Sequence, residues 1–532
     1  MERKLQDLCS GLEIKQVIGN NNLDVVITDL STHSKKITPS TLFFAHRGVV
    51  SDGRIFIKDV LNAGVGAIIA DAQHFDFSPY KDAAVPIILV DSAKHAKAVI
   101  SKEFFLPNNP LLLMIAVTGT NGKTSTAWII AKALTAAGFP CAYMGTVGRR
   151  YYSASQKQDI VDDQLITSPD VIDFYRFISM AHKDGVKGVV IEVSSHGLDQ
   201  KRLGDVDWDA AVFTNLTQDH LDYHGTLENY AEAKRKLFTE ELKKSRKKFK
   251  TAAINVRDAV GSSLYGWCKK NAPEVKCLGY TQFGKDGDCM VLDFKSHQYG
   301  TDLKLNLDGA IVKFRSKLVG DYNVENMLAA ASILAGFSQK LVLTAEQIAK
   351  GLSSVSPVPG RLERIENDKL SVFIDYAHTP DALLRAQDSL RKLTNGKLIT
   401  LFGCGGDRDK TKRPKMAAEV EKLSDYAVVT SDNPRTEDPD TIIQETIAGF
   451  KSRDFDSRGK ASYEVERSGV KAIFEYVAIT DRREAIRHAI TVAKPGDVIL
   501  IAGKGHEEYQ EVNGERHHFS DHEECRKVLA EL

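Results

Sequence analysis

The residues from Ile115 to Thr124 carry the clearest chemical signal in this sequence. The apolar run 111–117 predicts a buried strand, a glycine-rich turn follows, and the residues after Thr124 have helical spacing. Such a turn points backbone N–H groups at an anion, and the helix dipole adds positive potential. Lys123 would reach the outer phosphates of a nucleoside triphosphate, and the Thr124 hydroxyl would contact Mg²⁺. The pattern predicts a phosphate loop, although Val117 replaces the first glycine of the strict motif.

Two further clusters contain residue types that can bind a metal ion. Glu192 lies at the end of a predicted strand over 186–193, where a carboxylate is a usual Mg²⁺ ligand but can also cap a helix. His220 lies in the segment 215–225, which is dense in hydrogen-bond donors and acceptors. Because Mg²⁺ prefers oxygen ligands, chemistry alone leaves His220 as a loop histidine.

The composition argues against several classes of protein. Lys+Arg and Asp+Glu both number 71, so the net charge is zero and nothing indicates binding to nucleic acid or to a membrane surface. The seven cysteines form no Cys-x-x-Cys pair, which indicates reduced thiols packed as small apolar side chains. The N-terminus lacks the apolar core of a signal peptide, and no run of about 18 apolar residues occurs. We therefore expect a soluble, cytoplasmic protein.

The chain is too long, at 532 residues, for a single core, and its pattern predicts three α/β domains. Residues 1–107 alternate short apolar runs with polar turns, which predicts a small α/β domain. After a Pro- and Asn-rich linker, the strand–helix–strand pattern of 108–356 predicts a mostly parallel sheet. Within it, 277–319 is expected to add antiparallel strands. A second Pro-rich break opens a last α/β domain, 357–532, and ligands are expected at the C-terminal ends of the strands.

Five motifs, in chain order, resemble those of the Mur ligases, most closely the MurE branch, which adds the third amino acid to UDP-N-acetylmuramoyl-L-Ala-D-Glu. They are Gly-Thr-Asn-Gly-Lys-Thr (119–124), Glu-Val-Ser-Ser-His-Gly-Leu (192–198), Asn-Leu-x-x-Asp-His-Leu-Asp-Tyr-His-Gly (215–225), Asp-Tyr-Ala-His-Thr-Pro-Asp (375–381) and Gly-Lys-Gly-His-Glu (503–507). The resemblance implies an N-terminal UDP-binding domain, a central P-loop ATPase-like domain and a C-terminal, Rossmann-like domain that binds the amino acid. About 20 residues around 451–478 are additional to the compact family pattern, and no function is assigned to them.

The resemblance also implies a catalytic set and a metal-binding set. Lys123, His220 and Lys234 would be catalytic, and Thr124, Glu192, His220 and Lys234 would hold Mg²⁺. Lys234 would be carbamylated, which turns a cation into an anion. From the residues alone, Lys234 is instead interpreted as a solvated helix lysine.

The binding sets for the two large substrates are likewise carried over from the motifs. ATP would contact Gly119, Thr120, Asn121, Gly122, Lys123, Thr124, Ser125, Asn323, Arg361, Asp375 and His378. The UDP-sugar peptide would contact Ser34, Asp52, Gly53, Thr167, Ser168, Ser194 and Arg202. The chain departs from the family pattern at His33, Lys35, Ser40 and Ile166.

The incoming amino acid would be selected by residues of the last domain. The implied set is Arg408, Asp432, Asn433, Pro434, Arg435, Gly503 and Glu507. Asp-Asn-Pro-Arg (432–435) is the form seen in members that add meso-diaminopimelate, whereas lysine-adding members lack the arginine. Arg435 could alternatively be a turn residue with a surface salt bridge.

The implied reaction forms an amide from a carboxylate and an amine, through an acyl phosphate and a tetrahedral intermediate. It would need cations around the transferred phosphate, and closure of the last domain to exclude water. Alternatives are the lysine-adding version of the ligase, a folylpolyglutamate synthetase-like ligase, a catalytically degenerate MurE-like scaffold and a plain P-loop ATPase or kinase. We expect a monomer.

Overall fold

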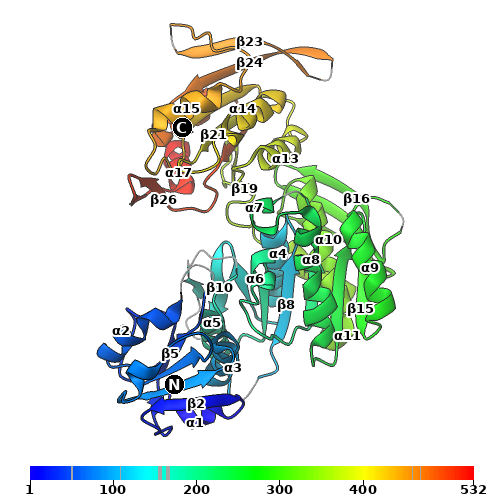
Figure 1. Ribbon diagram of the computed structural model, residues 1–532. Coiled ribbons are helices and arrows are strands. Elements are labelled where there is room, and N and C mark those ends of the chain that lie inside the picture. The colour runs from blue at the N-terminus through cyan, green and yellow to red at the C-terminus, as the bar shows by residue number, and fades with distance from the viewer. Residues whose placement is uncertain are drawn as a thin grey trace. The chain divides into compact units, whose positions relative to one another are not determined.

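A computed structural model of the protein describes residues 1–48, 52–107, 110–153, 158–162, 168–217, 219–284, 286–457, 459–467 and 469–532 (Figure 1). The chain forms two compact units. The first unit consists of Met1–Lys123, Gly138–Ala252 and Val260–Cys277, and the second of Thr124–Ala137, Ala253–Ala259 and Leu278–Leu532. The domain boundaries expected near 107 and 356 stay predictions.

The N-terminal part of the first unit contains a five-stranded sheet in the order β2-β7-β6-β5-β4. β4, β5, β6 and β7 are parallel, and β2 pairs antiparallel with β7. The short apolar runs at 42–45, 67–70 and 87–90 form strands that are buried within it. Its elements are β1 (Arg3–Lys4), α1 (Leu5–Cys9), β2 (Ile14–Gly19), β3 (Val26–Ile27), β4 (Asp29–Ser31), β5 (Thr41–Ala45), η1 (Gly53–Phe56), α2 (Ile57–Asn62), β6 (Ala67–Asp71), η2 (Ser78–Tyr80), β7 (Pro86–Val90) and α3 (Ala93–Phe105).

The rest of the first unit contains strands in the order β11-β10-β9-β12-β8-β13. β9, β12, β8 and β13 are parallel and almost wholly apolar, as expected of strands covered on both faces. Its elements are β8 (Leu113–Thr118), β9 (Cys141–Gly145), β10 (Gly148–Ser153), β11 (Gln158–Asp162), α5 (Val171–Lys183), β12 (Gly188–Glu192), α6 (Ser195–Asp199), β13 (Ala210–Phe213), α7 (Leu221–His224), α8 (Leu227–Lys236), the π-helix η3 (Leu237–Leu242) and, for the most part, α9 (Ala259–Asn271).

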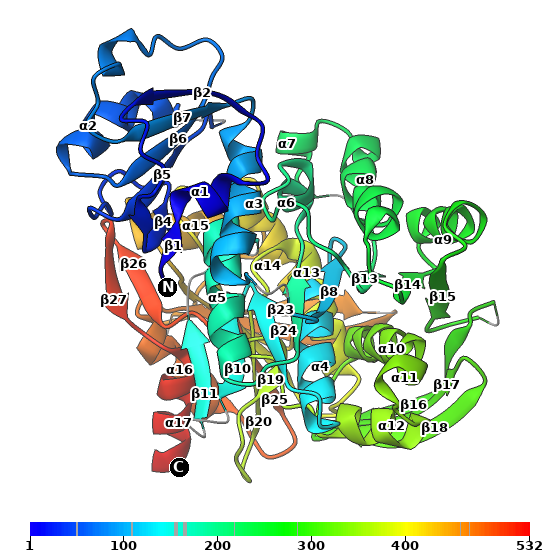
Figure 2. The ribbon, with the colours of Figure 1, turned by 90° about the horizontal axis from the view of Figure 1, so that it is seen from below.

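The second unit begins with α4 (Lys123–Ala136), apart from its first residue, and contains the antiparallel strands expected over 277–319. β16, β17 and β18 form an antiparallel meander whose first strand pairs in parallel with β15. The helices α10 and α12 pack against this meander (Figure 2). The elements are β14 (Lys250–Asn255) and β15 (Val275–Thr281), each divided between the units, then β16 (Cys289–His297), β17 (Gly300–Leu307), β18 (Ala310–Ser316), α10 (Asp321–Gly336), α11 (Ser338–Leu341) and α12 (Ala345–Ser353).

The C-terminal part of the second unit is a sheet of seven strands in the order β19-β20-β25-β21-β22-β24-β23. β20, β25, β21, β22 and β24 are parallel. Side chains of α13, α14 and α15 share one apolar core, and those of α16 and α17 share another. This arrangement confirms the Rossmann-like expectation. The elements are β19 (Glu363–Arg364), β20 (Ser371–Asp375), α13 (Pro380–Arg391), β21 (Leu398–Cys404), α14 (Lys412–Leu423), β22 (Tyr426–Ser431), α15 (Pro439–Ile447), β23 (Lys460–Arg467), β24 (Val470–Ala478), α16 (Arg482–Val492), β25 (Val498–Ala502), β26 (Tyr509–Val512), β27 (Glu515–His518) and α17 (Asp521–Glu531).

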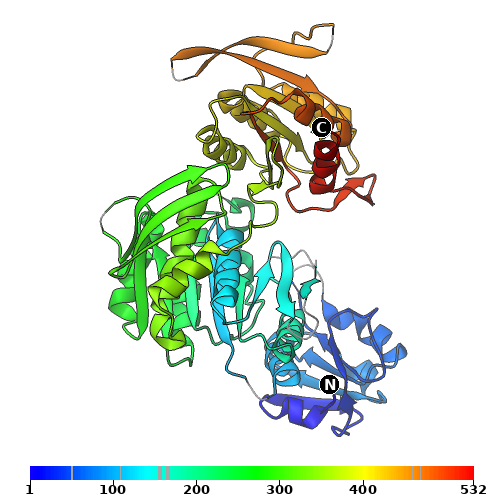
Figure 3. The same cartoon turned by 180° about the vertical axis from the view of Figure 1, so that it is seen from behind.

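The additional segment around 451–478 forms the hairpin of β23 and β24 (Figure 3). β23 is the edge strand of the C-terminal sheet. All seven cysteines are buried, as expected of small apolar side chains. Across the part of the chain that the structure describes, the helices are too short or too polar to cross a membrane.

Candidate active site

The phosphate loop connects β8 to α4. Gly119 has φ of 146°, in a region that favours glycine. A Cβ at this position would lie 1.9 Å from Thr214 Oγ1, so no larger residue fits. The backbone N–H groups of Thr120 and Asn121 donate to Asn215 O and Oδ1, at 2.8 and 2.9 Å. Asn215, just after β13, therefore fixes the conformation of the loop, and the binding of an anion by this loop stays a prediction.

Two lysine side chains meet at the loop carbonyls. Lys123 Nζ donates to Gly119 O at 3.1 Å and to Thr120 O at 2.7 Å, and Lys234 Nζ donates to Gly119 O at 2.7 Å. Lys234, in α8, is only 1% exposed, so its interpretation as a solvated helix lysine is wrong. Burial holds the pKa of Lys234 well below its usual value, and the charge of Lys123 lowers this pKa further. The Lys234 side chain therefore loses its proton at a lower pH than an exposed lysine does.

Glu192, the last residue of β12, is a buried carboxylate with several donors around it. Tyr143 OH and Thr146 N donate to Oε1, the latter at 2.9 Å, and Thr146 Oγ1 donates to Oε2 at 3.2 Å. A Cβ at Gly145 would lie 2.1 Å from Glu192 Oε1. The end of β9 therefore holds the carboxylate in place, and a fixed oxygen donor of this kind suits Mg²⁺.

His220 belongs to a cluster of rings beside the loop. Its backbone is left-handed, with φ of 51°, and its Nε2 lies 3.5 Å from Asp219 Oδ2. The ring centroid lies 5.0 Å from that of His196 and 6.0 Å from that of Tyr230. Tyr230 also places its OH 3.2 Å from Thr120 Oγ1 and its ring 4.4 Å from Lys234 Nζ. Tyr230 thus connects His220 and Lys234 to the phosphate loop.

The donors present fit a metal ion only when other oxygen ligands join them. Within the described ranges, no three His, Cys, Asp or Glu side chains lie close enough to hold a metal ion. Glu192 supplies buried carboxylate oxygens, and His220 supplies a ring nitrogen, which Mg²⁺ rarely binds. A carbamate on Lys234 and nucleotide phosphates would supply the oxygens that these two residues lack. The residues therefore fit a Mg²⁺–nucleotide better than the metal ion alone.

A cavity of about 500 Å³ in the first unit is lined by an excess of cations. Its lining includes His46, Arg47, Lys94, Lys97, Ser168, Asp170, Lys201 and Arg202. Such a charge balance favours an anionic ligand. Ser168 and Arg202 were expected from the sequence to bind the UDP-sugar peptide, and Ser194 lies next to Ser168, with 3.2 Å between the two hydroxyl oxygens. The four basic or titratable residues from 46 to 97 were missed, because they carry no motif.

The remaining residues expected at the UDP-sugar peptide are less directly placed. Asp52 accepts from Arg54 Nε and Nη2 at 2.9 and 2.7 Å, and this pairing lowers the pKa of Asp52. Gly53 N donates to His46 O at 3.0 Å, so these residues shape the cavity wall at His46. Ser34 is half-buried in a turn after β4. Thr167 lies outside the described residues.

The nucleotide contacts expected in the second unit gather near the start of α10 and the end of β20. Asn323 is buried and donates to Val319 O at 2.8 Å. Asp375 accepts from the backbone N–H of Leu362, next to Arg361, at 2.7 Å. The Arg361 guanidinium lies 4.9 Å from the Tyr376 ring centroid, and His378 Nδ1 lies 2.9 Å from Tyr376 O. Burial raises the pKa of Asp375. Thr124 and Ser125 lie, buried, in the first turn of α4.

Three of the residues expected to select the amino acid lie around a buried lysine that the sequence did not single out, Lys504. Its side chain is 0% exposed, and its Nζ lies 2.9 Å from Asn433 Oδ1, 3.4 Å from Asp432 Oδ1 and 3.8 Å from Glu507 Oε2. Asn433 Nδ2 also donates to Glu507 Oε2 at 3.0 Å. Burial raises the pKa of Glu507, and the Asp432 charge raises it further. Lys504 thus offsets two carboxylates that would otherwise repel each other.

Arg435 lies beside this cluster with a left-handed backbone, φ 53°. Its Nη1 donates to Gly406 O at 2.7 Å and its Nε lies 3.7 Å from Glu511 Oε2. The side chain is 20% exposed, and the alternative interpretation of Arg435 as a turn residue with a salt bridge stays a prediction. Pro434 is buried, Gly503 has φ of 116°, and Arg408 is exposed with its Nη1 3.4 Å from Asp407 O.

Comparisons with known proteins place these motifs in a family. Residues 117–334 match the Mur ligase middle domain, and residues 360–505 match the Mur ligase, glutamate ligase domain. A UDP-N-acetylmuramoyl-L-alanyl-D-glutamate–2,6-diaminopimelate ligase of Aquifex aeolicus is 37% identical over 94% of both chains. The ligase of the same name from Geobacter metallireducens is 37% identical over 99% of both chains.

A solved structure of a ligase with this name is also similar. It has a TM-score of 0.69 and 30% identity, and the match covers 100% of this chain and 99% of that one. The likeness therefore includes residues 1–107, which neither domain model matches. This chain belongs to the Mur ligase family and is an ATP-dependent ligase.

Proposed function

We propose that this protein joins meso-2,6-diaminopimelate to UDP-N-acetylmuramoyl-L-Ala-D-Glu in peptidoglycan precursor synthesis, at the expense of ATP. Full-length similarity to ligases named for this reaction supports the substrates. The observation that carries the choice of amino acid is the placement of Arg435, whose guanidinium lies between Gly406 O and Glu511 beside the Asn433–Glu507 pair. The three domain roles, a cytoplasmic location and a monomeric state belong to the same proposal.

The two lysines near Gly119 have different proposed roles. ATP would supply the phosphoryl group that converts the substrate carboxylate to an acyl phosphate, with ADP as the leaving group, and Mg²⁺ would offset the negative charge of the phosphates. Lys123, at the mouth of the phosphate loop, stabilises negative charge on the transferred group. The amine of the incoming amino acid then attacks, and a tetrahedral intermediate releases phosphate.

Lys234 is proposed to react with carbon dioxide. Its neutral amine nitrogen attacks the carbon of CO₂ and releases a proton, which leaves a carbamate anion. Burial and the low pKa of this lysine support the step, because only the neutral amine is nucleophilic. The carbamate, Glu192, His220 and Thr124 would then hold Mg²⁺, and the carbamate would also balance the charge of Lys123.

Arg435 is proposed to bind the distal carboxylate of diaminopimelate. A planar guanidinium binds a carboxylate with two parallel hydrogen bonds. Glu507 and Gly503 O would take the distal ammonium group, which lysine also possesses. Arg435 therefore carries the proposed selection between the two amino acids.

The alternatives predict different outcomes in one assay. ATP-dependent phosphate release is measured with UDP-N-acetylmuramoyl-L-Ala-D-Glu and either meso-diaminopimelate or lysine. We expect release that depends on the UDP-dipeptide and is much faster with diaminopimelate. A preference for lysine would indicate the lysine-adding version, activity with a folate in place of the UDP-dipeptide would indicate the folylpolyglutamate synthetase alternative, and no turnover at all would indicate a scaffold.

A further inference from the structure

Two loops follow neighbouring parallel strands of the C-terminal sheet. β21 ends at Cys404 and β22 at Ser431, and these two residues are paired in register. The loop 405–411 carries Arg408, and the turn 432–437 carries Arg435. Their relative position therefore determines where the Arg435 guanidinium lies.

Each loop contains one left-handed residue that is not glycine. Asp407 and Arg435 both have φ of 53°. Aspartate tolerates this conformation better than arginine, whose long side chain gains nothing from it locally. Such conformations persist where surrounding contacts fix them, and they gather at functional sites.

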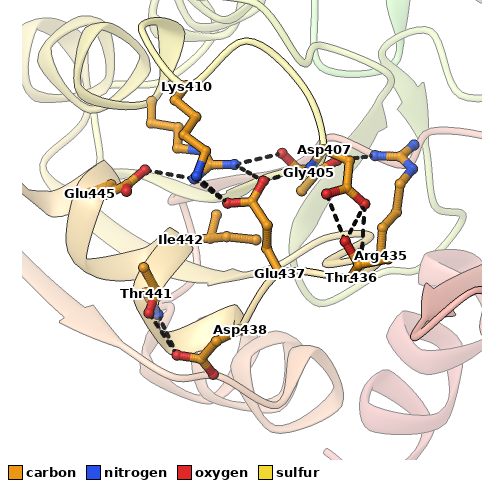
Figure 4. A network of polar contacts seen from close by, with 12 residues as sticks. Gly405, Asp407, Lys410, Arg435, Thr436, Glu437, Asp438, Thr441, Ile442 and Glu445 are labelled. Atoms are coloured by element: carbon orange, nitrogen blue, oxygen red, sulfur yellow. Dashed lines mark hydrogen bonds and ion pairs between the residues drawn. The ribbon is translucent and has the colours of Figure 1, made fainter.

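The contacts that fix the two loops are polar and join Asp407 to the residues after Arg435 (Figure 4). The Asp407 carboxylate accepts from Thr436 Oγ1 at 2.8 and 2.9 Å and from Thr436 N at 3.1 Å. Glu437 accepts from Asp407 N at 2.6 Å and from Lys410 Nζ at 2.9 Å. We name Asp407, Thr436 and Glu437 the loop–turn network.

A buried arginine anchors this network to the domain. Arg413, in α14, is 0% exposed, and its guanidinium donates to both oxygens of Glu437, at 2.9 and 3.1 Å. It also donates to Gly405 O at 3.3 Å and to Glu445 Oε2 at 2.6 Å. Glu437 therefore lies between a fixed cation of the core and the backbone of the loop.

The backbones of the loop and the turn are in direct contact at Gly406. A Cβ at Gly406 would lie 1.9 Å from Pro434 O, and Gly406 N donates to Asn433 O at 2.9 Å. The carbonyl of the same glycine accepts from Arg435 Nη1 at 2.7 Å. Any shift of the loop against the turn therefore moves the group that orients the guanidinium.

We propose that the loop–turn network is a specificity device: it positions Arg435 for the distal carboxylate of the incoming amino acid, a role that rests on the proposed function above. Asp407, Thr436 and Glu437 touch no substrate in this role. They act through the Gly406 carbonyl, and they are positioning residues. Because these residues act on Arg435, loss of the network should weaken recognition of the amino acid and leave phosphoryl transfer intact.

The test compares Thr436→Val with a matched control, Thr441→Val, at the start of α15. Thr436 is exposed, so its replacement does not disturb the core. Thr441 offers the same chemistry in a different place, because its N and Oγ1 donate to Asp438 Oδ2 at 3.1 and 2.7 Å at the start of α15 (Figure 4). Thr441→Val removes an equivalent hydroxyl–carboxylate bond without touching the loop 405–411.

The readouts are KM for diaminopimelate, ATP and the UDP-dipeptide, kcat, and the ratio of kcat/KM for diaminopimelate to that for lysine. We expect Thr436→Val to lower this ratio about five- to tenfold, through KM for diaminopimelate, because a hydrogen bond to a charged group is lost. KM for ATP and kcat should stay within about twofold of wild type, Thr436→Ser should restore the ratio, and Thr441→Val should leave it unchanged.

Arg435→Ala distinguishes a failure of the role proposed for the loop–turn network from a failure of the role proposed for Arg435 itself. If it lowers the ratio while Thr436→Val behaves like Thr441→Val, the loop–turn network has no role in specificity and the inference is overturned. If Arg435→Ala leaves the ratio unchanged, the proposed function of Arg435 fails, and the inference fails with it.

Discussion

In the phosphate loop and in the turn at 432–437, the carbonyl of a glycine accepts a hydrogen bond from a long basic side chain. In each, a side-chain nitrogen donates at 2.7 Å to the carbonyl of a glycine, Lys234 to Gly119 and Arg435 to Gly406. Lys234 is almost fully buried and its pKa is depressed, whereas Arg435 is 20% exposed and lies beside Glu511. A lysine can lose its proton and react, and an arginine cannot. The first region is therefore suited to chemistry and the second to recognition.

The largest expected effect is the loss of the reactive lysine. Lys234→Ala should reduce ligation by about 10³-fold or more, because it removes the anion proposed to hold Mg²⁺ and to balance Lys123. Short carboxylic acids should partly restore activity by supplying the missing carboxylate. Steady-state phosphate release, with and without added acetate or propionate, measures both effects.

Lys234→Arg is the matched control for this variant. It keeps a cation and a similar length but cannot form a carbamate under the same conditions. Wild-type turnover in either variant would contradict the proposed modification and make Lys234 a structural residue.

Lys123→Ala should have a comparable but smaller effect, a loss of roughly 10²–10³-fold in the phosphoryl-transfer step. The folded state should persist, because the Lys123 ammonium contacts loop carbonyls rather than the apolar core. Phosphate release with the UDP-dipeptide present measures the step, and far-UV circular dichroism checks the fold. Normal release would mean that the loop after β8 binds something other than the transferred phosphate.

Arg435→Ala should lower the preference for diaminopimelate over lysine rather than the rate of phosphoryl transfer. We expect the preference for diaminopimelate over lysine to fall by roughly 10- to 100-fold, the value of about one charged hydrogen-bonding pair. KM for ATP should be unchanged. Competition between the two amino acids, with the products separated by mass, gives the ratio directly. An unchanged ratio would return Arg435 to the role of a turn residue.

The sequence predicted the phosphate loop better than the turn at 432–437. The phosphate loop is formed by contiguous residues, whereas the contacts of the turn join residues far apart in the sequence. Gly119 and Lys123 belong to one contiguous motif, so a strand, a turn and a helix in order were enough to place them. Lys234 could not be placed by residue type, since a helix lysine is usually exposed. Its spacing of four from Tyr230 was the available signal, and that ring does cover it.

The parallel strands of both large sheets were also predicted well, because long buried apolar runs are distinctive. The loop–turn network was not predictable in this way. Asp407 and Thr436 are 29 residues apart, and they meet only because β21 and β22 are adjacent and in register. Lys504 was missed for a similar reason, since its partners Asp432 and Asn433 come from a different strand end.

The smallest expected effect concerns acid stability and tests the second region alone. Hydrogen bonds from Arg413, then from Lys410, lower the pKa of Glu437 to about 2. A carboxyl whose pKa is lower in the folded state than in the unfolded chain stabilises the fold above its unfolded pKa, and this contribution is lost as the pH falls toward the folded value. The urea midpoint of Glu437→Gln should therefore lie below that of wild type by a constant amount from pH 7 to about 5, and the gap should shrink below about pH 4.5.

Glu419→Gln, which removes an exposed ion pair with Lys422, should show little gap at any pH. A gap for Glu437→Gln that is independent of pH would mean that its charge does not hold the loop to the turn.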